Sequence, residues 1–389
     1  MIGKGEYLSQ LTAATGQMKS QVIGTDLSGS SPPSVFIGRA NYPKLSAGPM
    51  IASVHGDTSH MDMPESWIPG TITQEEIIRY RLGLVRGIHK VDARDINTRF
   101  IEKLQEIALA NTSVESEARF TTTPNGTSFS EEHTPFGPSA PIEQLTIEPV
   151  RWNRDLERIY YDTDLPAADA IMMLHESGLP FSSVQKALSV GTMGKKRGRR
   201  LVPTRWSITA CDSTIAKNLL TRVKTCTPVD TWRVHEYSSL HNKYAVILMP
   251  TGWQYEWSEA FIHVLGDEQL VFSDYERHNP KTTYSHLGGC YYSCKMAVLE
   301  ALAREQRQAG VIVLREATQG YIPLGVFNVR ENVRQAMREP GFACEGISDV
   351  LSHLSETFTL PIRRFIEEGT ILPDVMQERQ CTLSEFTRP

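Results

Sequence analysis

The sequence predicts a mixed α/β or α+β fold, in which a mixed sheet with flanking helices forms the C-terminal part. Two apolar runs, AVILM at 245–249 and VIVL at 311–314, have the composition of strands buried on both faces. Helical periodicity separates these and other predicted strands, as expected of layered α/β domains. The 389 residues, 40% hydrophobic and 22% charged, suffice for one large or two closely packed domains.

The N-terminal part is predicted to be a smaller region of strands and helices. Residues 29–50 combine short β-prone runs with Gly and Pro, which predicts strands joined by rigid loops. A helix is predicted over about 73–89, because Thr73 and Glu76 have capping-box spacing. A second helix is predicted over about 95–110, where apolar residues recur at helical spacing.

Two turn-rich stretches follow these helices. RFTTTPNGTSFSE predicts a β-hairpin that turns at Asn125-Gly126, since Asn-Gly is a strong hairpin signal. The Pro-rich stretch EHTPFGPSAPIEQ predicts a connection between two halves of the chain. We therefore predict an N-terminal region at 1–145, a mixed α/β domain packed against it at 146–372, and a flexible tail at 373–389.

The C-terminal half alternates strand-like and helix-like segments. Strands are predicted at 205–211, 231–237, 243–249, 269–274 and 310–316, and helices near 166–176, 181–190, 212–223, 257–265 and 290–308. This alternation is the basis for the predicted mixed sheet.

The overall composition excludes several classes of protein. The net charge of −5 is not that of a basic nucleic-acid coat, so any attraction to phosphate must come from a local patch. No run of about 18 apolar residues predicts a membrane helix, and the first residues lack the apolar core of a signal peptide. The six cysteines are scattered, which indicates a reducing cytoplasm rather than a disulfide scaffold.

A short basic segment is the strongest candidate for binding phosphate. GTMGKKRGRRLVPTR gathers six cations among glycines: Lys195, Lys196, Arg197, Arg199, Arg200 and Arg205. Glycines let a loop approach a phosphate backbone, and arginine forks match phosphate oxygens. The segment therefore predicts a nucleic-acid or nucleotide contact, and the alternative is a solvated loop that touches nothing.

The next residues predict the start of a helix beside these arginines. In RWSITACDSTIAKNLL a predicted apolar strand leads into Asp212 and Ser213, which have the character of an N-cap. A helix N-terminus next to arginines can hold an anion, with Arg205 close to both features. The alternative is simple capping without a ligand.

Acid, base and metal-ligand candidates lie elsewhere. His55, Asp57, His60 and Asp62 fall within one short segment, HGDTSHMDMPESW, and such side chains suit zinc or manganese. Their spacing matches no known metal motif, so a loop of satisfied polar groups is the favoured interpretation. The cofactor is therefore unknown, with a divalent metal as the candidate. His241 precedes a predicted buried strand, where catalytic groups often lie, but a histidine there more often only bonds a backbone carbonyl. No Walker loop, dinucleotide fingerprint or nucleophile elbow is present.

The last ten residues, QCTLSEFTRP, place Gln380, Leu383 and Phe386 three positions apart. In a 3₁₀ turn such residues line one side, so the leucine and phenylalanine would form an apolar plug that orders on binding. The spacing matches the peptides that bind the sliding clamp PCNA, except that Thr387 replaces the second aromatic residue. The alternative is a disordered tail with no partner.

Longer stretches carry a wider resemblance. SVFIGRANYPKLSAGPM, GDTSHMDMPESW, KKRGRRLVPTRWSITACD, SSLHNKYAVILMPTGWQYEW and LREATQGYIPLGVFNVRE resemble the archaeal Nre family, from about residue 24 onward. The resemblance implies a role in repairing DNA damage, an archaeal cytoplasm and a C-terminal PCNA-binding peptide. Some members begin with a cysteine-rich zinc-binding segment, which this chain lacks because no cysteine precedes Cys211. The resemblance implies no catalytic residue.

Two functional hypotheses follow. In the first, the chain is a repair protein that contacts DNA or a nucleotide through the basic segment and PCNA through the tail. In the second, it is a hydrolase of phosphate esters in nucleic acids or in nucleotides such as ADP-ribose derivatives. Arg205 and the helix start at Asp212 would then hold the phosphate, while Asp57, His60, Asp62 or His241 would act as acid, base or metal ligand.

Overall fold

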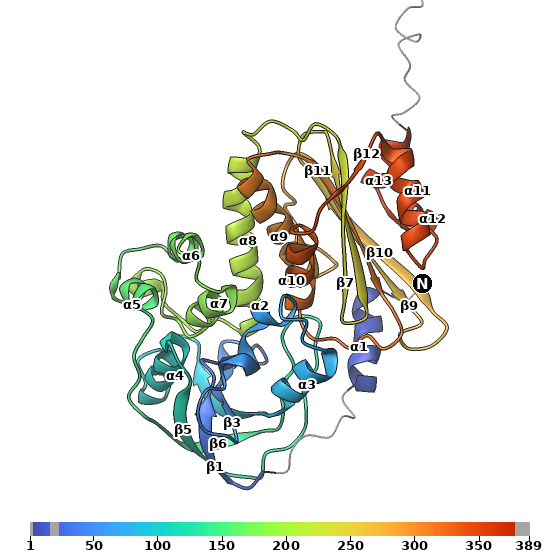
Figure 1. Ribbon diagram of the computed structural model, residues 1–389. Coiled ribbons are helices and arrows are strands. Elements are labelled where there is room, and N and C mark those ends of the chain that lie inside the picture. The colour runs from blue at the N-terminus through green and yellow to red at the C-terminus, as the bar shows by residue number, and fades with distance from the viewer. Residues whose placement is uncertain (1–2, 16–22, 378–389) are drawn as a thin grey trace, which may run out of the picture. The chain divides into compact units, whose positions relative to one another are not determined.

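The computed structural model describes residues 3–15 and 23–377, and its chain divides into two compact units. The N-terminal unit comprises residues 8–215 and 323–327. The C-terminal unit comprises residues 1–7, 216–322 and 328–389. Each unit contains one six-stranded mixed sheet with flanking helices, which confirms the predicted mixed α/β fold (Figure 1). The predicted division of the chain into segments 1–145, 146–372 and 373–389 remains a prediction.

The first sheet has the strand order β1-β5-β6-β4-β3-β2. Its strands are β1 (Asp26–Ser31), β2 (Val35–Gly38), β3 (Lys44–Ala52), β4 (Leu84–Asp92), β5 (Val114–Phe120) and β6 (Ser139–Ile147). Only β4 and β6 pair in parallel, while the remaining neighbours in this sheet are antiparallel. One face of the sheet buries Ile37, Leu45 and Val85 against Ile101 and Leu104 of α4 (Arg99–Leu109).

The other helices of the N-terminal unit lie mostly in long connections between and after the strands. They are η1 (Ser59–Asp62), α2 (Pro64–Trp67), α3 (Gln74–Leu82), α5 (Arg154–Tyr161), α6 (Ala167–Glu176), α7 (Phe181–Ser189) and η2 (Lys196–Gly198). Helix α1 (Lys4–Thr15) precedes the first strand, and α8 (Thr204–Val223) runs from this unit into the next. The predicted helices at 95–110, 166–176 and 181–190 are thereby confirmed as α4, α6 and α7.

The second sheet has the strand order β10-β9-β11-β8-β7-β12. Its strands are β7 (Trp232–Ser239), β8 (Asn242–Met249), β9 (Gln254–Ile262), β10 (Gln269–Glu276), β11 (Gly310–Ala317) and β12 (Phe342–Cys344). The two runs predicted to be buried strands lie in β8 and β11, which are adjacent and antiparallel. Every residue of β11 is buried, as predicted for a strand covered on both faces.

Helices cover both faces of the second sheet. They are α9 (Gly289–Glu305), α10 (Phe327–Ala336), α11 (Ile347–Thr357), α12 (Arg363–Glu368) and α13 (Ile371–Gln377). Figure 1 shows α11, α12 and α13 over one face, and α9 and α10 over the other. Val350 and Phe365 pack with Ile247 and Ile312 of the sheet in one hydrophobic core. Within the described residues, no helix combines the length and the apolar character needed to cross a membrane.

Two predicted elements have the opposite secondary structure. Residues 205–211, predicted as a strand, begin α8, in which buried Ser207, Cys211, Ile215 and Leu219 recur every four residues. Residues 257–265, predicted as a helix, lie mainly in β9, which is buried along nearly its whole length. Strand β9 was predicted as a helix because its two glutamates, Glu256 and Glu259, suggest a solvated helix face. Their buried partners lie far away in the sequence and are evident only in the structure.

Three predictions in the N-terminal unit are corrected. The capping box of Thr73 and Glu76 is present, but its helix ends at Leu82 and the β-branched residues after Gly83 form β4. Strand β5 pairs with β6 rather than with residues just after Asn125-Gly126, so no short hairpin forms there. The stretch predicted to connect two halves, 132–144, enters β6 in the middle of the first sheet.

Candidate nucleic-acid interface

The basic segment, residues 195–205, follows α7 and ends in the first turn of α8, within the N-terminal unit. Lys195, Lys196, Arg197 and Arg200 are exposed, and Lys196 and Arg197 lie in the short helix η2. None of these four forms an ion pair with any part of the chain that the structure describes. Their charges are therefore available to solvent or to an anionic ligand.

Arg199 has a different role from its neighbours. Its guanidinium donates to the carbonyl oxygens of Gly194, Tyr160 and Asp162 at 2.8, 2.7 and 2.8 Å. Burial lowers the pKa of Arg199, although the cation also lies 5.6 Å from the Tyr160 ring. Through these hydrogen bonds Arg199 attaches the basic segment to the C-terminal end of α5. The last carbonyl groups of a helix have no donors within the helix, so they are available to accept from Arg199.

Arg205 is also held by the protein itself. It forms an ion pair with Glu132, and both side chains are about one quarter exposed. Of the six cations predicted to bind phosphate, four are thus unpaired while Arg199 and Arg205 have partners. The binding roles of all six remain a prediction.

Backbone hydrogen bonds attach the end of the basic segment to the first sheet. The amide of Ala93, just after β4, donates to the Pro43 carbonyl at 2.8 Å, and the amide of Leu201 donates to the Ala93 carbonyl at 2.7 Å. The amide of Val202 donates to the Ser189 carbonyl at 2.9 Å. Ala93 therefore links the backbone at Pro43 to the backbone at Leu201 through one hydrogen bond on each of its polar groups.

The helix start predicted at Asp212 and Ser213 is wrong. Helix α8 already begins at Thr204, so both residues lie within it, where no free N-terminal amides can bind an anion. Asp212 is fully buried and interacts with other groups of the protein. The true N-terminus is attached to β2, because the Thr204 hydroxyl accepts a hydrogen bond from the Ile37 amide at 2.9 Å.

Asp62 belongs to a buried ion triad. Its carboxylate accepts from Arg81, and Lys186 Nζ lies 3.1 Å from its second oxygen. Burial alone would raise the pKa of Asp62, but the charges of Arg81 and Lys186 and a hydrogen bond from Ser34 outweigh it and lower that pKa. The carboxylate is therefore fully occupied in joining η1 to α3 and α7.

The other three residues of the predicted metal cluster each have separate contacts. His55 Nδ1 lies 2.6 Å from a carboxylate oxygen of Glu115, and Asp57 accepts from the Ser59 amide at 2.9 Å. The His60 ring packs edge-on against Tyr80, with ring centroids 5.0 Å apart. Within the described residues, no group of three or more potential metal ligands includes any of these four side chains. Their catalytic role stays a prediction.

His241 lies in the C-terminal unit, at the turn between β7 and β8. Leu240 and His241 have φ values of 50° and 57°, which is the geometry of a tight type I′ hairpin turn. The ring packs over Gly320, where an added Cβ would lie 2.8 Å from Cε1. The turn accounts structurally for a histidine at this position, and an acid or base role is a prediction.

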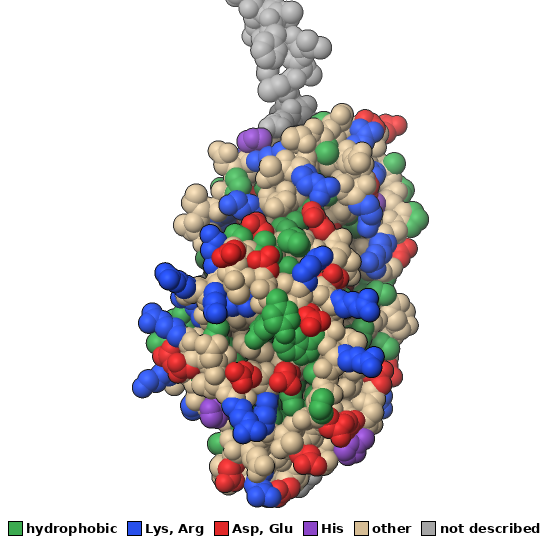
Figure 2. Space-filling model, turned by 90° about the vertical axis from the view of Figure 1, so that its left-hand side faces the viewer, with side chains coloured by type: hydrophobic (Ala, Val, Ile, Leu, Met, Phe, Trp, Pro, Cys, Tyr) green, Lys and Arg blue, Asp and Glu red, His purple; other side chains and the backbone are tan. Residues whose placement is uncertain are grey.

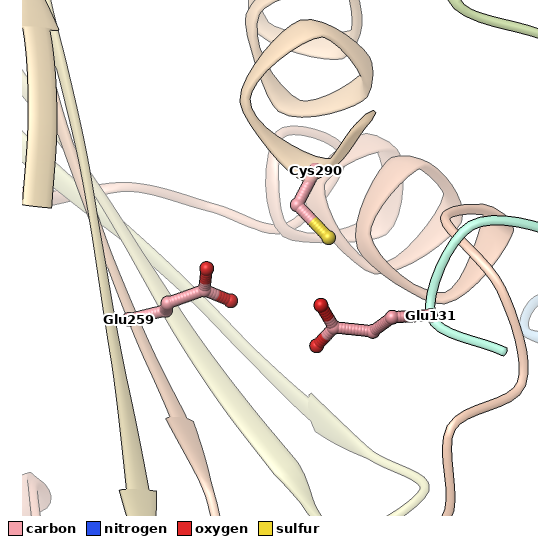
Figure 3. A group of neighbouring side chains, drawn as sticks. All are labelled: Glu131, Glu259 and Cys290. Atoms are coloured by element: carbon pink, nitrogen blue, oxygen red, sulfur yellow. The ribbon is translucent and has the colours of Figure 1, made fainter. Parts of the chain in front are cut away.

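Buried charges of the C-terminal unit escaped the sequence analysis. Glu259 projects from β9 toward the first turn of α9, and its carboxylate lies within 4.8 Å of the Cys290 thiol (Figure 3). The same carboxylate is paired with Lys4 and, at 2.9 Å, with Arg315. Glu131, also labelled in Figure 3, belongs to the N-terminal unit. Two cations thus neutralise Glu259, which indicates a structural role.

Arg86 of β4 is a second residue that the sequence analysis missed. Its guanidinium lies 4.4 and 5.2 Å from the Phe36 and Phe136 ring centroids and donates to the Ser46 carbonyl at 3.2 Å. It is buried, forms no ion pair within the described ranges, and its Nε has no hydrogen-bond partner there. The available signal was an arginine inside the otherwise apolar alternation of LVRGIHKV.

The PCNA-like residues Gln380, Leu383 and Phe386 lie outside the described residues. Figure 2 shows one face of the molecule, on which Lys and Arg side chains are interspersed with Asp and Glu. That mixture agrees with the slightly negative net charge of the whole chain. Any phosphate contact must therefore be a local feature such as the basic segment.

Two family models match nearly the whole chain. The model of the archaeal Nre N-terminal region matches residues 7–264, and that of the archaeal Nre C-terminal region matches residues 276–386. The chain belongs to the archaeal Nre family. The family resemblance read from the sequence motifs is thereby confirmed.

Three curated relatives extend over most of this Nre chain. It is 37% identical to DNA repair protein NreB of Archaeoglobus fulgidus, covering 94% of this chain and 93% of the relative. It is 33% identical to DNA repair protein NreA of the same organism, over 84% and 83% of the two chains. Identity to DNA repair protein NreA of Haloferax volcanii is 28%, over 94% and 90%. No solved structure matches the chain.

Proposed function

We propose that this Nre-family chain is a DNA-repair protein that binds nucleic acid through the basic segment and is recruited to PCNA by its C-terminal peptide. The role in repair follows from the relatives, all three of which are named DNA repair proteins. The high coverage of both chains supports transfer of that role to this protein.

The observation that carries the nucleic-acid proposal is the set of four exposed cations in the basic segment. Lys195, Lys196, Arg197 and Arg200 have no carboxylate partner among the residues that the structure describes. On a chain of net charge −5, such a group creates a local positive field that can steer and hold phosphate. Arg199 and the Ala93–Leu201 hydrogen bond hold the segment in place, so less ordering is needed on binding.

The test is a variant in which these four cations become glutamine. We expect weaker binding to a fluorescent DNA duplex and a smaller dependence of affinity on salt. Each lost phosphate contact should reduce the slope of log K against log salt by about 0.9. Fluorescence anisotropy at several salt concentrations measures both quantities.

A matched control neutralises four exposed cations of the C-terminal unit. Lys217, Arg304, Arg338 and Arg363 are exposed, so the same four glutamine substitutions alter net charge equally. We expect the control to bind DNA much as the wild type does. Equal loss in both variants would show that net charge alone governs binding and would refute a specific role for the basic segment.

The recruitment proposal rests on the spacing of Gln380, Leu383 and Phe386. A peptide tether raises the local concentration of the repair protein at replicating DNA, so modest affinity of the body for DNA would suffice. Calorimetry with PCNA should detect binding by the full chain and none by a chain that lacks residues 378–389. Equal affinity of both proteins would refute the tail as the anchor.

A gain-of-affinity variant sharpens this test. Thr387 occupies the position of the second aromatic residue in the PCNA-binding pattern. Thr387→Phe should tighten binding by about 1–3 kcal/mol, because a second ring would be buried in the clamp. Thr387→Ser is the control and should leave the affinity unchanged.

A further inference from the structure

Two exposed aromatic rings lie together in the N-terminal unit, next to the basic segment. Tyr42 is 44% exposed and Trp206 is 42% exposed, with ring centroids 5.1 Å apart and planes tilted by 53°. Large aromatic side chains usually gain stability by burial, so a pair that both remain exposed offers unused stacking surface. Neither the predicted phosphate contacts nor the family comparison accounts for this pair.

Rigid elements hold both rings. Tyr42 lies in the turn between β2 and β3, which is closed by a hydrogen bond from the Lys44 amide to the Asn41 carbonyl at 2.8 Å. Trp206 lies in the first turn of α8, which is attached to β2 through Thr204. The rings are therefore positioned before any ligand binds, which reduces the entropy lost on stacking.

Exposed cations lie on the segments that carry or adjoin the two rings. Arg39, Lys44 and Arg94 are exposed and form no ion pair in the described parts of the chain. The backbone hydrogen bonds from Pro43 through Ala93 to Leu201 link the turn that carries Tyr42 to the residue that follows Arg200. Asp92 lies opposite Lys44 in the sheet, and Glu132 is already paired with Arg205.

Arg86 adds a buried positive charge beside Gly38, close in sequence to the turn that carries Tyr42. Its NH2 group would lie 3.2 Å from a Cβ at Gly38, the residue before Arg39, and it donates to the carbonyl of Ser46. Burial lowers the pKa of Arg86 to about 10, so it stays protonated at neutral pH. An unpaired buried guanidinium is costly, and an anion bound above it would offset part of that cost.

We propose that Tyr42 and Trp206 form a stacking platform for an unpaired base of single-stranded DNA, whose phosphates follow the adjacent cations. This inference rests on the proposed nucleic-acid binding and names its substrate class. Bases within a duplex hide their faces by stacking on one another, whereas a single strand can place a base against a protein ring. Single-strand binding sites combine exposed aromatic rings, on which bases stack, with cations that contact the phosphates.

The test compares three fluorescent oligonucleotides of equal length: a single strand, the same strand with several abasic sites, and a duplex. The abasic strand keeps its phosphates but offers fewer bases to stack. Trp206→Ala should bind the intact single strand about 5- to 100-fold more weakly than the wild type does. Its affinity for the duplex and for the abasic strand should stay within about twofold of the wild type, because phosphate contacts are retained.

Two further variants complete the design. Trp206→Phe keeps an aromatic ring and should recover most of the lost single-strand affinity. Tyr284→Ala removes a ring that is 56% exposed in the C-terminal unit and should change nothing. Thermal unfolding of every variant checks that the fold is kept.

The outcomes separate this inference from the proposed function. If Trp206→Ala has no effect, or weakens all three oligonucleotides equally, the stacking platform is refuted. If that happens while the four-cation variant still loses DNA affinity, the proposed function survives without the platform. If the wild type binds none of the oligonucleotides, both proposals fail.

Discussion

The second sheet and the basic segment place their charged side chains in opposite surroundings. Glu256 in β9 is fully buried and accepts hydrogen bonds from the amides of Ile371 and Leu372 at 3.1 and 2.9 Å. Glu316 in β11 accepts from the Leu360 amide at 2.6 Å. In the basic segment, by contrast, Lys196 is exposed and has no ion partner in the described residues.

The buried carboxylates of the second sheet stabilise the fold, whereas the exposed cations of the basic segment are available to a ligand. A buried carboxylate is stable only when donors satisfy it, so each one specifies a contact between distant parts of the chain. An exposed cation gives little to folding, since water already solvates it. Substitutions should therefore have large effects on stability in the first group and on binding in the second.

The largest effect on stability is expected for Asp62→Asn. The neutral amide would leave Arg81 and Lys186 buried without a counter-charge, which should cost about 3–5 kcal/mol of unfolding free energy. Urea unfolding followed by circular dichroism measures the change. The control is Asp57→Asn, an exposed carboxylate for which we expect a loss of at most about 1 kcal/mol. Equal losses of unfolding free energy in Asp62→Asn and Asp57→Asn would contradict the distinction between buried and exposed charges.

The pH dependence of the stability difference between the wild type and Asp62→Asn provides a second test. Because the folded pKa of Asp62 is lower than its ordinary value of 3.8, its stabilising effect is present above about pH 4. The effect is lost as the pH falls through the folded pKa, when the carboxylate takes up a proton. The gap in stability between wild type and Asp62→Asn should therefore narrow from pH 6 to pH 3. A gap that widens toward pH 3 would refute the ion triad.

A smaller loss is expected for Arg199→Gln, within the basic segment itself. This arginine donates to three carbonyl oxygens near the end of α5, and the shorter amide cannot replace all of these hydrogen bonds. We expect a loss of about 1–3 kcal/mol in thermal or urea unfolding. Lys196→Gln is the matched control and should be neutral. If Arg199→Gln left the unfolding free energy unchanged, Arg199 would contribute as little to stability as the exposed cations do.

The smallest effect on stability is expected when all four exposed cations become glutamine. Lys195, Lys196, Arg197 and Arg200 make no ion pair in the described residues, so the unfolding free energy should change by about 0.5 kcal/mol or less. The same variant should lose DNA affinity, as proposed above. A large loss of stability would show that these cations help to fold the chain.

Local patterns explain which elements the sequence predicted well. The fully apolar runs of β8 and β11 have few alternatives to buried strands, and the capping box at Thr73 and Glu76 marks the start of α3 through its own hydrogen bonds. The gathering of cations between α7 and α8 is also a local property. Each of these signals depends on residues close together in the chain.

Other features depend on partners that are remote in sequence. Glu256 and Glu259 make β9 resemble an exposed helix, and only α13, Lys4 and Arg315 reveal that both carboxylates are buried and satisfied. The pairing of Arg205 with Glu132 is likewise a tertiary contact. For the same reason, neither Tyr42 nor Trp206 stands out as one member of an exposed pair until the fold brings their rings together.

The sequence by itself determined the fold class, the family and the existence of a cationic segment, because composition, periodicity and motifs record them directly. Only the tertiary structure decided which charges remain available, since pairing and burial depend on where distant segments meet. That is why Arg199 and Lys196, three residues apart in one basic run, have different surroundings: one guanidinium is bound by backbone carbonyls and one ammonium is exposed.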